Sequence, residues 1–335
     1  MSIKILKPGL LSTIQDEGRY GYQKDGMVVS GAMDKIALRI ANLLVGNAPH
    51  SAALEITLLG PQLYFDADHL IAVTGANLSP TIDGQPIKLW RPTLVKKGAI
   101  LAFGTPVLGC RSYVAIAGGY AVPEVLGSFA TYLRAGIGGY KGRALQADDI
   151  LNVNEPDARL TTYWRELELP ERTGNYNQAT WSPAPELYPT YEENPTIRAV
   201  KGPEYELFAE SDLTHFRTEK YLVKSESDRM GYRLQGSPLS LTEPKELLSS
   251  AVTFGTVQVP PQGQPIVLMA DHQTTGGYPR VAQVITADLP KLAQVQPGKY
   301  ITFEEVTLEK AQQLYMQQEQ KLEQLEWALQ IKMKL

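Results

Sequence analysis

Hydrophobic residues along this chain recur mainly in short runs that are rich in β-branched side chains or alternate with polar ones, and glycine or proline ends most of these runs. Alternation with a period of two places side chains on the two faces of a β-strand, and glycine and proline separate strands because they favour turns. The pattern therefore predicts a mainly β protein. The clearest predicted strands lie within 63–74, 93–103, 113–117 and 266–269.

A helical period interrupts this pattern twice. The first occurrence is 34–45, where Ser30 or Asp34 can cap the start and Gly46 can end the helix, so we expect one amphipathic helix packed on the first sheet. The second is the tail, 304–335, where apolar residues follow a heptad repeat. We expect a long helix there that packs on its own domain, in preference to a coiled-coil contact with a partner. The positions that carry these predictions are Ile36, Ala37, Ile40, Leu43 and Leu44, then Leu308, Ala311, Tyr315, Leu322, Leu325 and Leu329, with Gln318 as a polar interruption.

A proline-rich stretch divides the chain into two halves. Because repeated proline continues neither a helix nor a central strand, we expect a long surface connection at 155–195, with a short helix near 160–167. The halves share similar Gly-Pro, Gly-Gly-Tyr and Arg-x-Gly-Tyr segments, which two related β-barrels or a coincidence of glycine-rich turns would both explain. The predicted domains are a first barrel with the early helix at 1–154, the connection at 155–195, a second barrel at 196–305 and a C-terminal helix at 306–335.

Length and composition restrict the class of protein. At 335 residues the chain exceeds the size at which one hydrophobic core usually stops growing, so two domains are expected. The net charge of −4 and the lack of a Lys/Arg block argue against nucleic acid as a partner. The sequence has neither a signal-peptide pattern at its start nor a long apolar run, and Cys110, the only cysteine, permits no intrachain disulfide or thiolate cluster. These features predict a cytoplasmic protein without a membrane partner.

Common catalytic and nucleotide-binding motifs do not occur in the sequence. The four histidines form no pair with metal-ligand spacing, so no metal site is expected. Neither a G-x-x-x-x-G-K-[ST] phosphate loop nor a G-x-S-x-G nucleophile elbow is present. The glycine-rich run 136–143 can expose backbone N–H groups beside Lys141 and Arg143, which makes these residues candidates for a phosphate contact, although a plain glycine-rich turn is the preferred interpretation.

The segment 271–280 combines the largest variety of reactive side chains. An acid, a base, an amide, two hydroxyls and a cation follow a strand-like run, and paired glycines allow the backbone to approach a ligand. A ligand site and a loop whose polar groups satisfy one another both fit this composition. The same alternatives apply to 15–19 and 30–34, where turns and helix capping compete with a binding rim. The candidate binding residues are Asp16, Arg19, Ser30, Asp34, Asp271, His272, Gln273, Thr274, Thr275, Gly276, Gly277 and Tyr278.

These three segments, together with 227–234, resemble the hallmark motifs of the biotin-dependent carboxyltransferase family, also called the allophanate hydrolase subunit 2 family. The resemblance covers about 3–306, and its most specific part runs from 263 to 289. One departure is Ala147-Asp148, where the family tends to show Gly-Asp. The resemblance implies a fold of two cyclophilin-like β-barrel domains.

Within this family the chain is similar to members that act in an ATP-dependent 5-oxoprolinase. The resemblance implies a B subunit of the kinase-inhibitor type, a separate A subunit, and an assembly that converts 5-oxo-L-proline to L-glutamate with ATP hydrolysis. It also implies an antagonist of a sporulation-kinase inhibitor. Two alternatives stay open: a carboxyltransferase component that acts with a separate biotin carrier on a urea-like amide, and a purely regulatory binding protein. No biotin is expected on this chain, because Met333-Lys334 ends a predicted helix instead of lying at a hairpin tip.

The resemblance and the polar segments together predict a single cleft for a small anionic substrate. We expect Asp16, Arg19, Ser30 and Asp34 on one wall and Arg229 with 271–278 on the other. Arg229 would hold the substrate carboxylate, and His272, oriented by Asp271, would act as general acid or base. Thr274, Thr275 and the amides of Gly276 and Gly277 would stabilise negative charge on the amide oxygen. A structural, hydrogen-bonded His272 is the competing interpretation.

Overall fold

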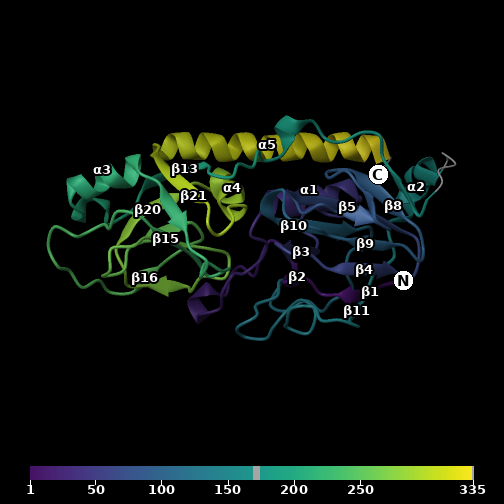
Figure 1. Ribbon diagram of the computed structural model, residues 1–335, viewed down its shortest axis with the longest axis horizontal. Helices are drawn as coiled ribbons and strands as arrows, with labels where there is room; N and C mark the ends of the chain where they lie inside the picture. The colour runs from purple at the N-terminus through teal and green to yellow at the C-terminus, as the bar shows by residue number, and fades with distance from the viewer. Residues whose placement is uncertain (169–173, 334–335) are drawn as a thin grey trace. The chain divides into compact units, whose positions relative to one another are not determined.

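The computed structural model describes residues 1–168 and 174–333, which form two compact units (Figure 1). Unit 1 contains Met1–Arg19, Asp34–Pro189 and Gln320–Leu335, and unit 2 contains Tyr20–Met33 and Thr190–Glu319. Each unit is therefore built from more than one segment of the chain. The predicted domain boundaries differ from these units, because they assign neither 20–33 to the second barrel nor the end of the tail to the first domain. They stay a prediction.

Unit 1 is built from two six-stranded antiparallel sheets. Apolar side chains of both sheets, such as Ile5 and Phe65 from one and Val73 and Val114 from the other, meet in one fully buried core. The first sheet has the order β11 (Ile150–Asn152), β1 (Ser2–Lys7), β4 (Gln62–Phe65), β9 (Ile100–Ala102), β6 (Thr81–Ile82) and β7 (Gln85–Pro86); the second has the order β12 (Tyr176–Gln178), β8 (Pro92–Val95), β5 (His69–Asn77), β10 (Leu108–Ile116), β3 (Ala53–Thr57) and β2 (Leu11–Gln15).

The early helix α1 (Lys35–Leu44) lies against β5 and β10 of the second sheet. Oδ1 of Asp34 accepts a hydrogen bond of 2.9 Å from the Ala37 N–H and so caps the first turn. The Asp34 N–H donates to the hydroxyl of Tyr113, which in turn donates to Glu55 over 2.7 Å. The predicted helix and its Asp34 cap are confirmed, and the helix packs on a sheet of the N-terminal half as expected, the one that contains β5 and β10.

The proline-rich stretch contributes more to unit 1 than a surface connection would. A 3-10 turn, η2 (Ala158–Leu160), leads into α2 (Thr161–Glu168), which confirms the predicted short helix. Strand β12 then pairs with β8 at the edge of the second sheet, and η3 (Pro185–Leu187) follows. The range 155–195 is thus partly a sheet element, because Tyr176–Gln178 lies between prolines where the backbone N–H groups are intact.

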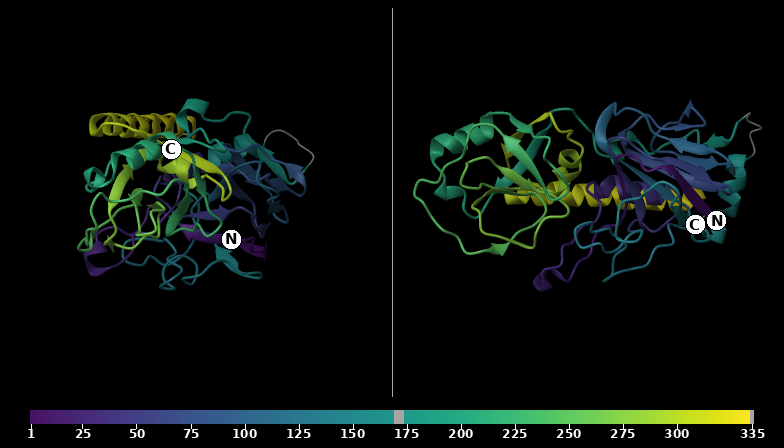
Figure 2. Two further views of the ribbon diagram at one scale, coloured as in Figure 1. Left: turned by 60° about the vertical axis from the view of Figure 1, so that its left-hand side comes forward. Right: turned by 60° about the horizontal axis from the view of Figure 1, so that its bottom comes forward.

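Unit 2 is a closed seven-stranded barrel (Figures 1 and 2). Parallel pairing of β13 with β21 closes it, and the neighbouring strands pair antiparallel. Met33, from the early segment of the chain, is buried in the same core as the barrel strands. The order around the barrel is β13 (Thr196–Lys201), β20 (Arg280–Val284), β17 (Thr256–Gln258), β18 (Ile266–Leu268), β15 (Gly231–Gln235), β14 (Tyr221–Val223) and β21 (Tyr300–Glu305).

Short elements surround this barrel. A separate two-stranded ladder pairs β16 (Ser250–Ala251) with β19 (Thr275–Gly276). The helical pieces are η1 (Gln23–Asp25), η4 (Tyr205–Leu207), α3 (Glu210–Thr218), η5 (Thr286–Asp288) and α4 (Leu289–Ala293). The β-rich class with few helices agrees with the sequence prediction.

The tail forms one 26-residue helix, α5 (Leu308–Met333), which confirms the predicted long helix. It begins in unit 2 and ends in unit 1. Leu322, Leu325 and Leu329 are buried, whereas Leu308 and Tyr315 are 58% and 44% exposed. The C-terminal half of the predicted apolar seam is thus buried, but it belongs to unit 1 and not to the unit in which the helix begins, so packing on its own domain stays a prediction. Lys334, the lysine weighed above as a biotin site, lies outside the described residues.

Two general features bear on function. Within 1–168 and 174–333, none of the helices has the length and hydrophobicity that crossing a bilayer requires. In the same described residues, His, Cys, Asp and Glu side chains form no group of three that is able to hold a metal ion.

Candidate functional site

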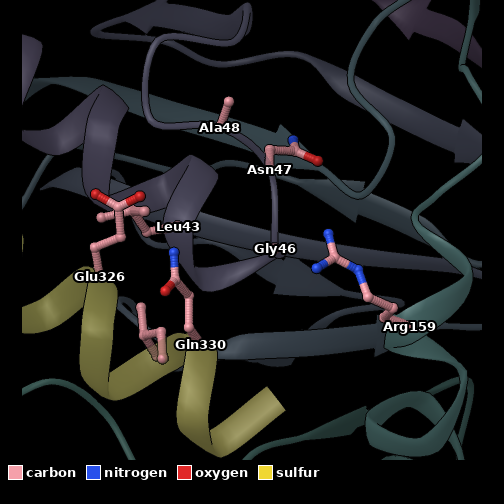
Figure 3. Close-up of a pocket in the computed structure, with 8 residues that line it drawn as sticks. Leu43, Gly46, Asn47, Ala48, Arg159, Glu326 and Gln330 are labelled. Carbon is pink, nitrogen blue, oxygen red and sulfur yellow. The ribbon is translucent and has the colours of Figure 1, made fainter. Parts of the chain in front are cut away.

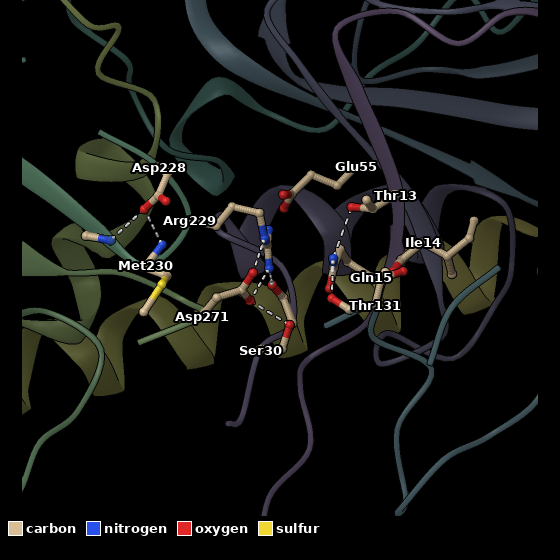
Figure 4. Close-up of polar contacts among 12 residues, drawn as sticks. Thr13, Ile14, Gln15, Ser30, Glu55, Thr131, Asp228, Arg229, Met230 and Asp271 are labelled. Atoms are coloured by element: carbon tan, nitrogen blue, oxygen red, sulfur yellow. Dashed lines mark hydrogen bonds and ion pairs between the residues drawn. The ribbon is translucent and has the colours of Figure 1, made fainter. Parts of the chain in front are cut away.

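A buried ion pair lies at the ends of two neighbouring barrel strands in unit 2 (Figure 4). Arg229 precedes β15 and Asp271 follows β18, and antiparallel pairing of these strands brings the two residues together. Nε and Nη2 of Arg229 each donate to one carboxylate oxygen of Asp271 over 2.9 Å. Both side chains are buried, so their two hydrogen bonds compensate the loss of hydration of the two charges.

The early segment of the chain completes this cluster. The hydroxyl of Ser30 donates to Asp271 over 2.6 Å, and Nη2 of Arg229 donates to the Gly31 carbonyl over 2.6 Å. Ser30 has a φ of 57°, a left-handed conformation that is strained for a residue other than glycine. The bonds to Asp271 and Arg229 hold the segment in this conformation. Of the predicted site residues, the structure thus brings Ser30, Arg229 and Asp271 into contact, and His272 is the next residue in the chain.

His272 follows Asp271 directly and is 6% exposed. Its Nδ1 lies 2.5 Å from the Gln273 carbonyl oxygen, and because a carbonyl oxygen only accepts, Nδ1 carries the proton and Nε2 the free lone pair. Burial lowers the pKa of His272, against the smaller raising effects of the Gln273 carbonyl and Asp271. The side chain is therefore a neutral imidazole near pH 7, with Nε2 as an acceptor.

The rest of the predicted loop is less buried. Gln273, Thr274 and Gly276 are half-buried, and Thr275, Gly277 and Tyr278 are exposed. Pairing of β19 with β16, together with a bond from the Val252 N–H to the Thr274 carbonyl, fixes the backbone here. The backbone of this loop is therefore held by hydrogen bonds, and its side chains have defined positions.

The predicted residues of unit 1 hold neighbouring loop backbone. Asp16 accepts hydrogen bonds from the Gly18 N–H, the Ser128 hydroxyl and the Phe129 N–H, over 2.8, 2.8 and 2.6 Å. Arg19 is fully buried and donates to the carbonyls of Val125 and Ala130. Asp34 caps α1. These contacts favour the structural interpretation of all three residues, and the predicted cleft with two walls stays a prediction.

The candidate phosphate loop is also held internally. Arg143 forms a bidentate pair with Asp149, at 2.6 and 2.7 Å, and this pair lowers the pKa of Asp149. Both Arg143 and Lys141 also lie over the ring of Tyr140. The Arg143 guanidinium thus already has an anionic partner, and the phosphate contact stays a prediction.

Two cavities lie away from the Arg229 cluster. One of about 260 Å³ in unit 1 lies between the end of α1 and α5, with Arg159, Glu326 and Gln330 around it (Figure 3). None of the predicted site residues lines it. The other, of about 720 Å³ in unit 2, is lined by Gly277 and Tyr278 of the predicted loop and by Val259, Pro260 and Pro261. It is the larger apolar hollow beside the candidate site.

Gln258, which sequence reasoning missed, lies next to the same loop. It occupies the polar position of an alternating strand, Thr256-Val257-Gln258-Val259, a pattern that normally indicates exposure to solvent. In the structure it is 4% exposed, because the β16–β19 ladder covers it. Alternation of polar and apolar residues along one strand does not predict that another segment of the chain buries its polar face.

The sequence profile described as the carboxyltransferase domain, subdomain A and B, matches residues 25–305. The chain belongs to this family. Among its relatives in the carboxyltransferase-domain family, the 5-oxoprolinase C subunit of Haemophilus influenzae is 41% identical over 96% of this chain and 97% of its own length. The 5-oxoprolinase C subunit of Escherichia coli K12 is 42% identical over 98% of both chains.

Larger carboxyltransferase-domain proteins match at lower identity. Urea amidolyase of Saccharomyces cerevisiae is 30% identical over 97% of this chain. The crystal structures of urea carboxylase and urea amidolyase from Kluyveromyces lactis superpose with TM-scores of 0.86 and 0.85, each at 32% identity over 97% of this chain. The chain spans only 20% of that urea amidolyase and 29% of that urea carboxylase. These matches confirm the predicted fold class.

Proposed function

We propose that the chain is the C subunit of an ATP-dependent 5-oxoprolinase, active only with a B subunit and an A subunit in the cytoplasm. The observation that carries this proposal is the sequence identity of 41% and 42% with two bacterial C subunits of that enzyme. Each alignment covers at least 96% of both chains. The assembly would open 5-oxo-L-proline to L-glutamate and hydrolyse ATP.

His272 is the proposed acid and base of the reaction. Opening a lactam adds water across the C–N bond, so a proton leaves the attacking oxygen and a proton reaches the ring nitrogen. Nε2 of His272, with its free lone pair and lowered pKa, is suited to accept the first proton and return it to the nitrogen. The Thr274 and Thr275 hydroxyls and the Gly276 and Gly277 amides are proposed as donors to the amide oxygen.

Arg229 and Asp271 fit a positioning role better than the predicted direct ones. Two nitrogens of Arg229 are committed to Asp271 and to the Gly31 carbonyl, which leaves less of the guanidinium for a substrate carboxylate. Through the Ser30 hydroxyl and the adjoining backbone, the pair fixes the segment that begins with His272. We therefore propose that Arg229, Asp271 and Ser30 position the reacting groups and do not themselves contact the substrate.

Likeness to urea carboxylase favours a second candidate, a carboxyltransferase component that moves a carboxyl group between a separate biotin carrier and a urea-like amide. A regulatory role, as antagonist of a kinase inhibitor through the B-type partner, rests on the sequence resemblance alone. This regulatory role would use the same surface for the B-type partner as the enzyme complex does, so the chain could have both roles.

Co-expression with candidate A and B subunits, followed by measurement of ADP and L-glutamate formed from 5-oxoproline, tests the proposal. We expect stoichiometric formation of both products by the complex and neither product from the isolated chain. Robust turnover by the single chain would contradict the need for partners. Carboxylation of urea with an added biotinylated carrier, without opening of 5-oxoproline, would establish the second candidate instead.

A further inference from the structure

Gln258 is a buried residue whose side-chain oxygen, Oε1, accepts no hydrogen bond from any residue in the described part of the chain. Its neighbours Val257 and Val259 pack in the barrel core, so the Gln258 side chain, on the opposite face of β17, points out of the barrel. Its Oε1 is nevertheless shielded from solvent. A buried carbonyl oxygen without a donor destabilises a fold, which calls for a functional explanation.

The surroundings of Oε1 belong to the loop that carries His272. A Cβ added to Gly276 would lie 3.1 Å from Oε1 of Gln258 and 3.6 Å from Nε2 of Gln273. The lack of a side chain at 276 therefore keeps the face of Oε1 clear of a methyl group. A hydrogen-bond acceptor, Oε1 of Gln258, and a donor, Nε2 of Gln273, thus lie near the same point.

Two other glutamines of unit 2 have hydrogen-bond partners for both the oxygen and the nitrogen of the carboxamide. Oε1 of Gln264 accepts from the Gly236 N–H over 3.0 Å, and its Nε2 donates to the Gly236 carbonyl over 3.1 Å. Gln283, on the adjacent strand, accepts from Thr256 and donates to the Phe254 carbonyl. Gln258 differs from these two glutamines, whereas in unit 1 Oε1 of Gln15 and Oδ1 of Asn177 are also buried without a hydrogen-bond partner in the described residues. Gln264 also illustrates how one carboxamide can bind an N–H and a carbonyl together.

We propose that Gln258 positions the substrate by pairing with the amide edge of its lactam ring. In a five-membered lactam the N–H and the carbonyl lie side by side, because the ring forces the amide into the cis form. Oε1 of Gln258 accepts the ring N–H, and a carboxamide nitrogen of Gln258 or Gln273 donates to the ring carbonyl. The inference rests on the proposed function and adds the group that recognises the amide.

A route to this position adjoins it. Val259, the residue after β17, and Gly277, the residue after β19, both line the 720 Å³ cavity. The ladder beside Gln258 is two residues long on each side. A ligand in the cavity would therefore lie one residue from Gln258 on one side and one residue from Gly276 on the other.

Comparison of two substrates in the assembled complex tests the proposal. With the wild-type chain, 5-oxoproline and its N-methyl derivative, which lacks the ring N–H, should differ in kcat/KM by about 10-fold or more. Gln258→Leu should raise the KM for 5-oxoproline by about 10-fold and largely remove that discrimination. Gly276→Ala, which keeps the carboxamide but places a methyl group against Oε1, should raise KM in the same direction.

Thermal unfolding of the isolated chain separates positioning from a structural role. Gln258→Leu should raise the melting temperature, because it replaces an unpaired buried amide by an apolar group, whereas Gln264→Leu should lower it. A lower melting temperature for Gln258→Leu would overturn the proposal. So would unchanged KM and discrimination in that variant while the wild-type complex turns over 5-oxoproline. If the wild-type complex does not open 5-oxoproline, the proposed function itself fails, and the lactam assignment fails with it.

Discussion

Buried polar side chains in both units are mostly committed to the backbone of nearby loops. Asp16 and Arg19 hold the loop 125–131, and Arg229 holds the Gly31 carbonyl. Such groups bear on function through the geometry they impose, since a donor that already has a partner has less capacity for a ligand. His272, with its free Nε2, and Gln258 differ in this respect from their neighbours.

Replacement of His272 by Asn should reduce turnover of 5-oxoproline by the complex about 100-fold or more, because a general base of that kind contributes at least this factor. The wild-type kcat/KM should fall as the pH falls below the ordinary histidine pKa of 6.5, since burial lowers the pKa of His272 and only the neutral form accepts a proton. The measurement is a pH profile of both proteins. His215→Asn, at an exposed position on α3, is the control. An unchanged acidic limb in the His272 variant would refute its role.

Asp288 is a buried charge on which the stability of unit 2 should depend. It is fully buried and binds Arg198 through the backbone N–H, Nε and Nη2. Burial raises its pKa, but the bonds from Arg198 and the charge of Lys291 outweigh that effect, so the pKa lies below the ordinary 3.8. The unfolded chain therefore takes up the proton first, and this stabilisation is present above pH 3.8 and lost as the pH falls through the lowered value.

Asp288→Asn should accordingly reduce the free energy of unfolding by about 3 kcal/mol at pH 7, because it leaves a partly buried guanidinium without its charged partner. Urea titrations at pH 7 and at progressively lower pH measure the difference, which should shrink on acidification. Glu206→Gln, in an exposed pair with Lys201, should leave the unfolding midpoint unchanged. Equal effects of the two substitutions would contradict the assignment.

At the scale of elements, the apolar seam of the tail helix α5 is exposed to solvent in its N-terminal part and buried in its C-terminal part. Leu322 is 2% exposed, whereas Leu308, two heptads earlier, is 58% exposed. Leu322→Ala should cost about 3 kcal/mol of stability, because it leaves a cavity under the helix, and Leu308→Ala should change stability by less than about 0.5 kcal/mol. Denaturant unfolding measures both. A large effect of Leu308→Ala would indicate that the exposed half packs on something as well.

The similarity between the two halves is weaker in local structure than in sequence. Gly60-Pro61 leads into strand β4, but Gly202-Pro203 leads into the 3-10 turn η4. Gly118 and Gly119 have φ values of 86° and 74°, whereas Gly276 lies in the extended strand β19. The matching glycines thus serve different turns, so they do not establish a duplicated element.

At the scale of the whole molecule, the chain passes between the units several times. Each unit contains residues from both sides of the proline-rich stretch: 20–33 belong to unit 2, and 320–335 belong to unit 1. Limited proteolysis should cut first between 155 and 195, yet the two fragments should stay together under native conditions, since each supplies part of the other's core. Size-exclusion chromatography compared with a denaturing gel checks this. Fragments that separate under native conditions, or early cleavage within 257–289, would contradict the arrangement.

Local patterns in the sequence determined the β-rich class, the helices α1, α2 and α5, and the segments that mark the family. These predictions succeed because side-chain period and capping residues act over one or two turns of chain. Which residues meet is decided by strand pairing over long separations. Antiparallel pairing of β15 with β18 brings Arg229 to Asp271, burial of Met33 in the barrel core carries Ser30 to the same cluster, and a two-residue ladder buries Gln258. Only the tertiary structure could decide these contacts, because a period of two says which face a side chain takes but not what covers that face.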